Sequence, residues 1–572
     1  MPKISYIKIE NFRKLKRFEY QFDKDSNIIC IVGRGDSGKS TLLEAISLVL
    51  SPSWNIAFND SDFTDLDINN PIRIEAIVYD LPDKLYTTAG SGLCTTFLNE
   101  QTLCEEELTD SSIEAVRIIL TVMSDLEPKW MMANTMTEQI IKASDRAKLN
   151  VFLVSDFVDK HFSWNKGTPL ASLLKKEMMD IPVKDNTSSV LDIFREAKWK
   201  FDEAKLEKFS GVEDKFVTTA SKYGFSIEDI KTSIDWKDLY YSEGRLCLHD
   251  GKIPFRLKGK GSKRLLSIAL QLSLIEGSGI ILIDEVEQGL EPDRVQQFVS
   301  TLKKESGAQI FLTTHSSSVA VELSVNDIFI MNETTLYNFP KDNNSQSLAR
   351  TNPEAFFAKR IIIAEGSTEV GLLRAVNDSL QEKGFNLSTK GIRIVNGGGA
   401  AKMINYCNVF LDAGYNVCFL CDNDRPEDKK KIDNLKDRGV RIIQTEENLC
   451  AEKQLFKDVS WKTVIQLFEL GKVISGNKAI SSLKTAGMLN DNNELIGDST
   501  EVRELLGVLS SEKGIDKGEK PFPKNDEPKS WFKTITHGEE MGSIVLSDFE
   551  NLKETYLGSM IDQLIGWIKS DA

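Results

Sequence analysis

The run GRGDSGKS at Gly33–Ser40 has the residue types and the spacing needed to hold a polyphosphate. It fits the pattern GxxxxGK[ST], in which backbone N–H groups of a glycine-rich loop surround phosphate oxygens and the following helix favours their negative charge. In such a loop Lys39 is expected to reach the β- and γ-phosphates, and the Ser40 hydroxyl to ligate magnesium. The nucleotide-binding residues that we predict here are Gly33, Arg34, Gly35, Asp36, Ser37, Gly38, Lys39, Ser40 and Thr41.

Two later strand ends carry side chains that suit the hydrolysis of a nucleotide. The apolar run Ile280–Ile283 stops at Asp284 and Glu285. Asp284 is expected to hold magnesium through its water shell, and Glu285 to polarise the attacking water. The run Gln309–Leu312 is soon followed by His315, which would touch the γ-phosphate or that water. A lone histidine after a strand is more often structural, but the order of the motifs favours an ATPase.

A glycine-rich turn, KGKGSKR at Lys258–Arg264, precedes a strongly apolar helical pattern between the two halves of this predicted site. Ser262 in the turn has two interpretations. It is either the N-cap of the helix, where a serine hydroxyl accepts a backbone N–H, or part of a nucleotide contact. The residues alone leave both open.

Carboxylates also follow apolar runs in the second half of the chain. Glu365 comes directly after Arg360–Ala364, and Asp422 and Asp424 follow Val417–Cys421. Because sites in open α/β sheets lie at the carboxyl ends of the strands, these three acids are expected to converge. Acids in one crevice repel each other unless cations neutralise them, and all-oxygen ligation suits Mg²⁺ or Mn²⁺. Each motif is weak alone, but their order and their strand-end positions favour a metal site.

These side chains need α/β elements to bring them together. At 572 residues the chain is too long for one hydrophobic core. We predict an α/β fold with an ATPase domain over 1–345, a linker over 346–358, and a second α/β domain over 359–572 that ends in a helical extension. Within the first domain, PIRIEAIVYDL and EAVRIILTVMSD alternate like strands that complete the ATPase sheet. Residues 150–240 are predicted to form a helical insert.

The composition narrows the classes of function. The net charge is −15, and eight cysteines without CxxC pairs and only four histidines argue against a zinc cluster or a disulfide framework. No apolar run approaches the ~20 residues that a bilayer requires, so we expect a cytoplasmic protein that does not bind a membrane. The local basic clusters Lys258–Arg264 and Arg425–Arg441 are more simply explained as solvated surface than as nucleic-acid contacts.

The phosphate loop, the glycine–serine turn, the Asp-Glu strand and the histidine strand, in that order, resemble the ATP-binding-cassette class in its RecF/SMC-like branch. In that class the serine turn of one protomer closes on the ATP held by another. The resemblance therefore implies a dimer around ATP, with Ser262 at the partner's nucleotide. It also favours a dimerisation arm at residues 150–240, the alternative being a pair of surface helices.

The E-G-x-x-E turn, the NGGGAAK turn and the DxD strand end resemble a Toprim domain, which occurs in topoisomerases, primases and nucleases. The resemblance implies that Glu365 is the family's conserved glutamate and that Asp422 and Asp424 are its metal-binding pair. Glu369 is similar to the second glutamate of the nuclease members, and Glu452 is a further candidate ligand for a second metal. Two cations could then hold a scissile phosphate from both sides.

An ABC-type ATPase followed by a Toprim domain resembles the OLD (overcoming lysogenisation defect) nucleases, which include the nuclease subunit of Gabija anti-phage systems and effectors paired with retrons. The resemblance implies an ATP-regulated, metal-dependent DNA endonuclease or nickase that defends against phage as a dimer or tetramer. A C-terminal lysine contributes to cleavage in the family, and we prefer Lys533 over Lys529. The run EVEQGLEP departs from the family's usual proline and leucine–histidine–proline pattern, although Asp284 and Glu285 remain.

Two questions stay open at this level. ATP could activate or restrain cleavage, and the partner could be a retron reverse transcriptase with its branched nucleic acid or a helicase-like subunit. A different class of function is an ATP-driven sensor and assembly protein whose Toprim domain binds DNA or a partner without cutting it. A topoisomerase or primase would need a strand-transfer tyrosine domain or a zinc module, and the residues predict neither.

Overall fold

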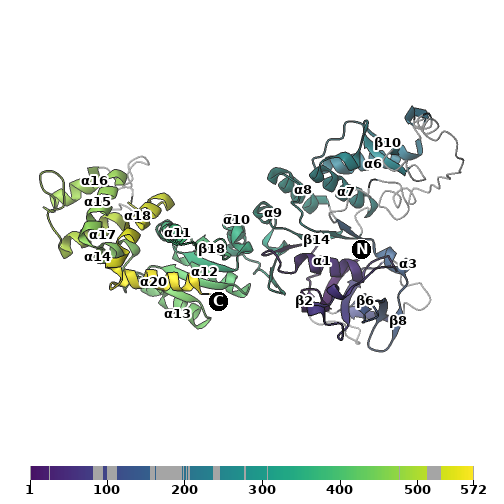
Figure 1. Ribbon diagram of the computed structural model, residues 1–572, viewed down its shortest axis with the longest axis horizontal. Helices are drawn as coiled ribbons and strands as arrows, with labels where there is room; N and C mark the ends of the chain where they lie inside the picture. Colours follow the sequence, from purple (N-terminus) through teal and green to yellow (C-terminus); the bar gives the residue numbers. More distant parts are fainter. Residues whose placement is uncertain are drawn as a thin grey trace. The chain divides into compact units, whose positions relative to one another are not determined.

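The computed structural model divides into two compact units, Met1–Asn338 and Phe339–Ala572, which are described separately (Figure 1). The structure describes residues 2–24, 26–81, 94–98, 112–154, 207–235, 245–275, 279–305, 307–475, 477–511 and 530–570, together with 162, 196, 199–200 and 202–203. Within these residues no helix is both long enough and apolar enough to cross a bilayer.

The first unit contains an antiparallel sheet with the strand order β2-β1-β4-β6-β7-β8, in which β5 also pairs with β6. Its strands are β1 (Lys3–Phe12), β2 (Leu15–Gln21), β4 (Ile72–Tyr79), β5 (Thr95–Leu98), β6 (Ile113–Val122), β7 (Pro128–Ala133) and β8 (Glu138–Ile140). The two strands that we expected to complete the ATPase sheet are β4 and β6. They pair with each other in this antiparallel sheet and not in the sheet that carries the phosphate loop, because β4 pairs on its other side with β1.

The second sheet of the first unit is mainly parallel, with the order β16-β15-β3-β14-β13-β9. Its strands are β3 (Ile28–Val32), β9 (Val151–Val154), β13 (Ile280–Ile283), β14 (Gln309–Thr313), β15 (Ile328–Asn332) and β16 (Thr335–Asn338). Strands β3, β13 and β14 are buried at every residue, as expected for parallel strands covered on both faces. The parallel register brings the carboxyl ends of these three strands to one edge. Helices α1 (Lys39–Val49), α3 (Ala143–Arg146), α7 (Lys260–Ile275), α8 (Pro292–Glu305) and α9 (Ser317–Glu322) complete the described helices of this core.

The predicted helical insert at 150–240 lies partly outside the described residues, so its role as a dimerisation arm stays a prediction. Its described part is not helical throughout. Helix α6 (Glu207–Lys222) is present, but β9 pairs with β13 in the parallel sheet, where Val154 is buried and the other three residues of VFLV are half-buried. Strand β10 (Ile230–Asp235) pairs with β11 (Arg245–Asp250), which also pairs with β12 (Ile253–Pro254).

The second unit is built on a four-stranded parallel sheet with the order β18-β17-β19-β20. The strands are β17 (Arg360–Ala364), β18 (Ile392–Asn396), β19 (Asn416–Cys421) and β20 (Arg441–Gln444), and α11 (Ser367–Glu382), α12 (Ala400–Asp412) and α13 (Lys429–Asp437) connect them. The residues of β17 are all buried, which explains the continuous apolar run in the sequence.

The segment predicted as a linker over 346–358 is helical and belongs to the second unit, which begins earlier, at Phe339. Helix α10 (Asn343–Thr351) starts where the Asp342 carboxylate accepts the N–H of Ser345, and the 3₁₀ helix η8 (Pro353–Phe357) follows. Phe356 is fully buried, and its ring packs on that of Phe339 with 4.9 Å between centroids. The linker prediction was wrong because helix caps, and helices that are buried on one face only, contain the same polar residue types as a linker.

The chain beyond β20 folds into a group of helices with its own core. They are α14 (Ala451–Asp458), α15 (Trp461–Ser475), α16 (Asn477–Thr485), α17 (Thr500–Ser511), α18 (Ile535–Ser547), α19 (Phe549–Leu552) and α20 (Tyr556–Lys569). Trp531 is buried at the centre of this core, beside Phe456 and Phe468. Helix α18 crosses α11 so closely that a Cβ on Gly371 would lie 2.4 Å from the Gly538 carbonyl carbon. In Figure 1 this crossing joins the green sheet region to the yellow C-terminal helices.

Candidate functional sites

The phosphate loop connects β3 to α1 and depends on two glycines with positive φ. Gly33 has φ 150°, and a Cβ there would lie 2.4 Å from the Met331 carbonyl oxygen. Gly38 has φ 97° at the N-cap of α1. Side chains at either position would therefore strain the backbone or collide with it. The exposed residues of the loop are Arg34, Gly35, Asp36 and Ser40. The buried ones are Ser37, Gly38 and Lys39, and Thr41 is half-buried.

Lys39 points its ammonium into the loop. Its Nζ donates to the carbonyl oxygens of Gly33 at 3.0 Å and Arg34 at 2.7 Å. Burial lowers the pKa of Lys39 to about 8, although Asp284 and Glu285 favour the charged form. A nearly buried cation held by two loop carbonyls and, at 3.4 Å, by the Ser37 hydroxyl is well placed to exchange these partners for phosphate oxygens, as the sequence pattern predicts.

The structure brings Ser40 and Asp284 together from two ends of the ATPase region. The Ser40 hydroxyl donates to Asp284 Oδ1 at 2.9 Å, and the Thr313 hydroxyl donates to the same oxygen at 2.6 Å. These contacts follow from the neighbouring positions of β3, β14 and β13 in the sheet. The backbone N–H of Glu285 donates to Thr313 Oγ1 at 2.8 Å, and Glu285 adopts φ 47°. The structure therefore joins Asp284 to Ser40, and the roles of Asp284 and Glu285 with magnesium and water stay predictions.

His315 lies beyond β14 and is exposed. Burial of part of the ring and the charge of Lys39 lower the pKa of His315, so the neutral imidazole is favoured. Sequence reasoning missed the residue that holds this segment. Glu287 accepts the backbone N–H of His315 and the hydroxyl of Thr314, each at 2.6 Å. The signal was present in EVEQGLEP, where the third residue is also an acid.

Ser262 is not the N-cap of α7, because the helix already begins at Lys260. The serine lies in the first turn and is half-buried. This turn packs tightly against the segment after the Asp-Glu pair, since a Cβ on Gly261 would lie 2.0 Å from the Gly289 carbonyl oxygen. Of the two interpretations, capping is wrong, and the nucleotide contact stays a prediction.

The second candidate site lies at the carboxyl edge of the parallel sheet in the second unit. Strands β17 and β19 are neighbours, and they end directly before Glu365 and Asp422. The Glu365 Oε2 accepts the backbone N–H of Asp422 at 3.1 Å. Asp422 Oδ1 in turn accepts the N–H of Ala451 at 2.8 Å, at the start of α14. The two acids that end adjacent strands are therefore close together.

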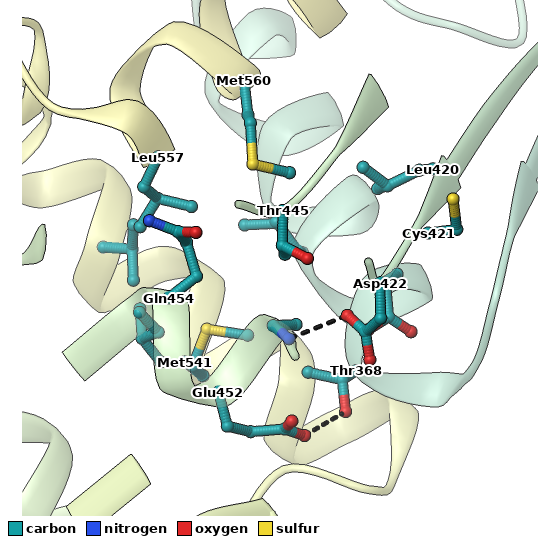
Figure 2. A pocket seen from close by; sticks show the side chains of 15 residues that line it. Thr368, Leu420, Cys421, Asp422, Thr445, Glu452, Gln454, Met541, Leu557 and Met560 are labelled. Atoms are coloured by element: carbon teal, nitrogen blue, oxygen red, sulfur yellow. Dashed lines mark hydrogen bonds between the residues drawn. The ribbon is translucent and has the colours of Figure 1, made fainter. Parts of the chain in front are cut away.

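Two buried glutamates complete this acidic group. Glu369, in the first turn of α11, accepts the N–H of Gly366 at 2.8 Å. Glu452 on α14 is fully buried, and its Oε1 lies 2.7 Å from Lys533 Nζ and 3.2 Å from the Thr368 hydroxyl. Its other oxygen, Oε2, is buried without a hydrogen-bond partner. Figure 2 shows Asp422, Thr368 and Glu452 on one side of a cavity of about 40 Å³, with Met541, Leu557 and Met560 on its apolar walls.

The acids strongly disfavour one another's ionisation. Burial, followed by the charges of Glu369, Glu365 and Glu452, raises the pKa of Asp422 to about 9. Burial and the charge of Glu452 raise the pKa of Glu369 to about 7, and burial also raises that of Glu365. Burial opposes the charge on Lys533, but the ion pair with Glu452 prevails and raises its pKa. Lys533 compensates only part of the negative charge that this group would carry if all of its acids were ionised.

The donor set fits hard divalent cations in its chemistry. All of the candidate side chains offer oxygen, the buried Glu452 Oε2 is orphaned, and the cluster is short of positive charge. Asp424 is exposed at the rim, beyond Asp422. Among the described residues no three or more His, Cys, Asp or Glu side chains already form a ligand shell. Glu452 could offer Oε2 to a cation while its Oε1 stays with Lys533.

Lys533, the lysine that we preferred for catalysis, lies beside the acids. It follows Phe532, whose carbonyl oxygen lies 3.0 Å from the Thr368 hydroxyl. Lys529 lies outside the described residues. Sequence reasoning missed Thr368, which links α11, α14 and this C-terminal segment in space, because no linear spacing relates the three.

Comparisons with known families agree with this division of the chain. Residues 356–424 match the family described as "Overcoming lysogenization defect protein-like, TOPRIM domain". Residues 2–118 match "AAA ATPase domain", and residues 99–322 match "AAA domain, putative AbiEii toxin, Type IV TA system". No curated protein matches the chain. The predicted α/β fold, with an ATPase region followed by a Toprim domain, and the resemblance to the OLD family are confirmed.

Several solved structures are similar to part of the chain. They include the Smc head domain from Pyrococcus furiosus bound to the C-terminal domain of ScpA, at 13% identity over 59% of this chain and 95% of that chain, with a TM-score of 0.35. The recombination mediator protein RecF shares 15% identity over 59% of this chain and 98% of its own, also with a TM-score of 0.35. The SMC head domain from Thermotoga maritima shares 13% identity over 59% and 99%, with a TM-score of 0.29.

Proposed function

We propose that this chain, which joins ATPase regions to an OLD-like Toprim domain, is an ATP-regulated, metal-dependent DNA endonuclease or nickase. We further propose that it acts in the cytoplasm as a phage-defence effector. The observation that carries the proposal is the convergence of Glu365, Asp422, Glu369 and Glu452 at one strand edge, with ionisation of the acids opposed. Such a group is costly to bury unless its function requires the charge.

The acids would hold the cations that the chemistry needs. Divalent cations, Mg²⁺ or Mn²⁺, when bound, activate a water and neutralise charge at a scissile phosphodiester. Glu365 and Asp422 are central because each ends a strand and they share a hydrogen bond. Glu369 and Glu452 would hold a second cation from the buried side, and Asp424 would contribute from the exposed rim.

Lys533 is the residue that we assign to the phosphate. Its side chain is 37% exposed, and its ammonium is held 2.7 Å from Glu452. If Glu452 turns toward a cation, the ammonium is released at the edge of the acidic group. There it can donate hydrogen bonds to a phosphate oxygen and stabilise the charge that develops during cleavage.

The ATPase region supplies the regulation in this proposal. Lys39 would bind the phosphates, Ser40 and Asp284 would hold magnesium, and Glu285 would orient the attacking water, with His315 beside the γ-phosphate. The hydrogen bonds joining Ser40, Thr313 and Asp284 support these roles. Ser262 would reach the nucleotide of a second copy, so that ATP controls assembly into a dimer or tetramer.

A defence effector of this kind needs a trigger. The family resemblance suggests a retron reverse transcriptase with its branched nucleic acid, or a helicase-like subunit, as the partner that presents DNA. The net charge of −15 supports a requirement for such help, because it works against unaided binding of a polyanion.

Cleavage of supercoiled plasmid, with and without ATP and in Mg²⁺ or Mn²⁺, tests the proposal. Asp422→Ala should reduce nicking and linearisation by about 100-fold or more. Removing a metal ligand should cost at least as much activity as removing a residue that only hydrogen-bonds to a ligand. ATP binding and oligomeric state should not change. Asp433→Ala, an exposed acid on α13, is the matched control and should cut normally.

Retained magnesium-dependent cutting by Asp422→Ala would refute the assignment. If the wild-type protein associates with DNA when ATP is present but yields no cleaved product in either metal, the non-cleaving sensor function is supported instead.

A further inference from the structure

The acidic site in the second unit is bordered by two hollows that carry basic side chains. Glu365, Asp422 and Asp424 line the first hollow together with Arg425 and Lys429. The second is a larger groove of about 590 Å³, lined by Asn448, Leu449, Lys453, Lys457, Thr500, Arg503, Glu504 and Val508. The first hollow is formed largely by the segment after β19, and the second by the segment after β20 together with α17.

A short backbone contact separates the two hollows. The N–H of Asn448 donates to the Asn423 carbonyl oxygen at 2.8 Å, and the N–H of Asn423 donates to the Leu449 carbonyl oxygen at 3.3 Å. Asn423 lies between the two aspartates of the DxD strand end. The wall of the groove is therefore fixed to the backbone that positions the acids, and further along that wall Ala451 donates its N–H to Asp422.

Helix α14 turns different side chains to the acids and to the groove. Successive residues of a helix point about 100° apart, so Glu452 and Lys453 cannot share a direction. Glu452 is buried with the acids, whereas Lys453 is exposed and Lys457 lies on the same face, about 6 Å further along the axis. The stem of Lys453 is directed by α17, because a Cβ on Gly507 would lie 3.2 Å from its Cγ.

The basic groups differ in how free they are. Lys453 has no ion-pair partner within the described part of the chain. Lys429 pairs with Glu447 at 3.2 Å, but both side chains are about two-thirds exposed, and such a pair contributes little. Arg503 donates to three backbone carbonyls at the end of α14 and pairs with Asp498, so its role is structural. Lys453 and Lys429 are therefore the cations that a ligand can engage.

We infer that Lys429 and Lys453 hold the sugar–phosphate backbone of DNA on the two sides of the scissile phosphate. This inference rests on the proposed nuclease function and identifies where its substrate lies. A polyanion that approaches an acidic crevice on a protein of net charge −15 needs local cations, and these flank the acids on both sides. We predicted from the sequence that the basic run Arg425–Arg441 is solvated surface. In this inference its Lys429, in the first turn of α13, contacts DNA.

DNA binding measured without cleavage tests the inference. A short fluorescein-labelled duplex and the corresponding single strand are titrated with the full chain in EDTA, with and without a non-hydrolysable ATP analogue. Lys453→Glu and Lys429→Glu should each weaken binding several-fold and reduce the slope of log affinity against log salt by about one. Lys383→Glu, at the exposed C-cap of α11 and in the lining of neither hollow, makes the same charge change and should bind normally.

Thermal unfolding of all three variants should match the wild type, since each side chain is exposed. The inference is overturned if Lys453→Glu and Lys429→Glu bind DNA as Lys383→Glu does, or if the wild type binds neither form of DNA. Cleavage is scored separately on plasmid. Binding that depends on the two lysines in a protein that never cuts would leave the surface standing and remove only the nuclease.

Discussion

At the scale of single residues, the main feature of the second unit is the unbalanced charge around Asp422. Its carboxyl group follows a buried strand. Burial, together with the charges of Glu369, Glu365 and Glu452, raises the pKa of Asp422 to about 9. Lys533 balances part of this charge through Glu452. The cluster therefore has more acid than its own basic residue can neutralise, which is the condition that a divalent cation would relieve.

This imbalance predicts how stability depends on pH. An aspartate in the unfolded chain loses its proton near pH 4, whereas folded Asp422 keeps it up to about pH 9. Between these values the folded state binds more protons, so the free energy of unfolding falls as the pH rises. Thermal unfolding in EDTA should show a lower Tm at pH 8.5 than at pH 6.

Two comparisons make that measurement specific to the site. Asp422→Asn, which has no proton to lose, should flatten the decline, and added Mg²⁺ should raise the wild-type Tm more at the higher pH. A decline of equal size in wild type and Asp422→Asn would show that other groups cause it.

At the scale of elements, the crossing of α11 and α18 decides whether the acidic site is complete. Gly371 and Gly538 let the two helices approach, and the segment just before α18 carries Phe532 and Lys533 to Thr368 and Glu452. Because α11 also begins with the turn that holds Glu369, this one helix contact positions residues from three parts of the chain.

Gly371→Ala should break this arrangement. The new Cβ would lie 2.4–2.5 Å from the backbone of α18, which cannot move without shifting the helix. We expect a loss of roughly 1–3 kcal/mol in the free energy of unfolding, as for other overpacked sites, and weaker plasmid cleavage. Chemical denaturation and the plasmid assay measure the two effects.

Gly566→Ala in α20 is the matched control. A Cβ at that position meets nothing within 4 Å, so the substitution should be neutral or should stabilise the helix by about 0.5–1 kcal/mol. If Gly371→Ala is as stable as Gly566→Ala and cuts normally, the close crossing does not have the role that we give it.

At the scale of the whole molecule, we propose that ATP binding controls assembly. The loop around Lys39 and the Ser40–Asp284 pair is formed within one chain, and we propose that Ser262, in the first turn of α7, contacts the nucleotide of a second copy. A site that is completed by a second copy would make oligomeric state the output of ATP binding.

Glu285→Gln should trap this assembly, because it keeps the nucleotide contacts and removes the group that polarises water. Light scattering after size exclusion should show a mass increase with ATP and Mg²⁺ in Glu285→Gln. Adding Ser262→Arg should abolish the increase while leaving ATP affinity intact. An unchanged mass in Glu285→Gln with ATP demonstrably bound would rule out nucleotide-driven assembly.

The sequence by itself determined the features whose geometry is local. The phosphate loop is a conformation of adjacent residues, and its glycines can be read from spacing alone because only glycine fits φ values such as those at Gly33 and Gly38. The strand-end positions of Glu365 and Asp422 were equally predictable, since parallel strands present their carboxyl ends on one edge.

Only the tertiary structure decided which distant side chains meet these features. Glu452 and Lys533 come from helices and loops whose packing has no fixed spacing, and their ion pair depends on the α11–α18 crossing. The same holds for Glu287 beneath the His315 segment and for the lysine-lined groove beside α14. Local sequence patterns encode backbone conformation over a few residues, whereas the contacts of a buried charge are chosen by the packing of the whole unit.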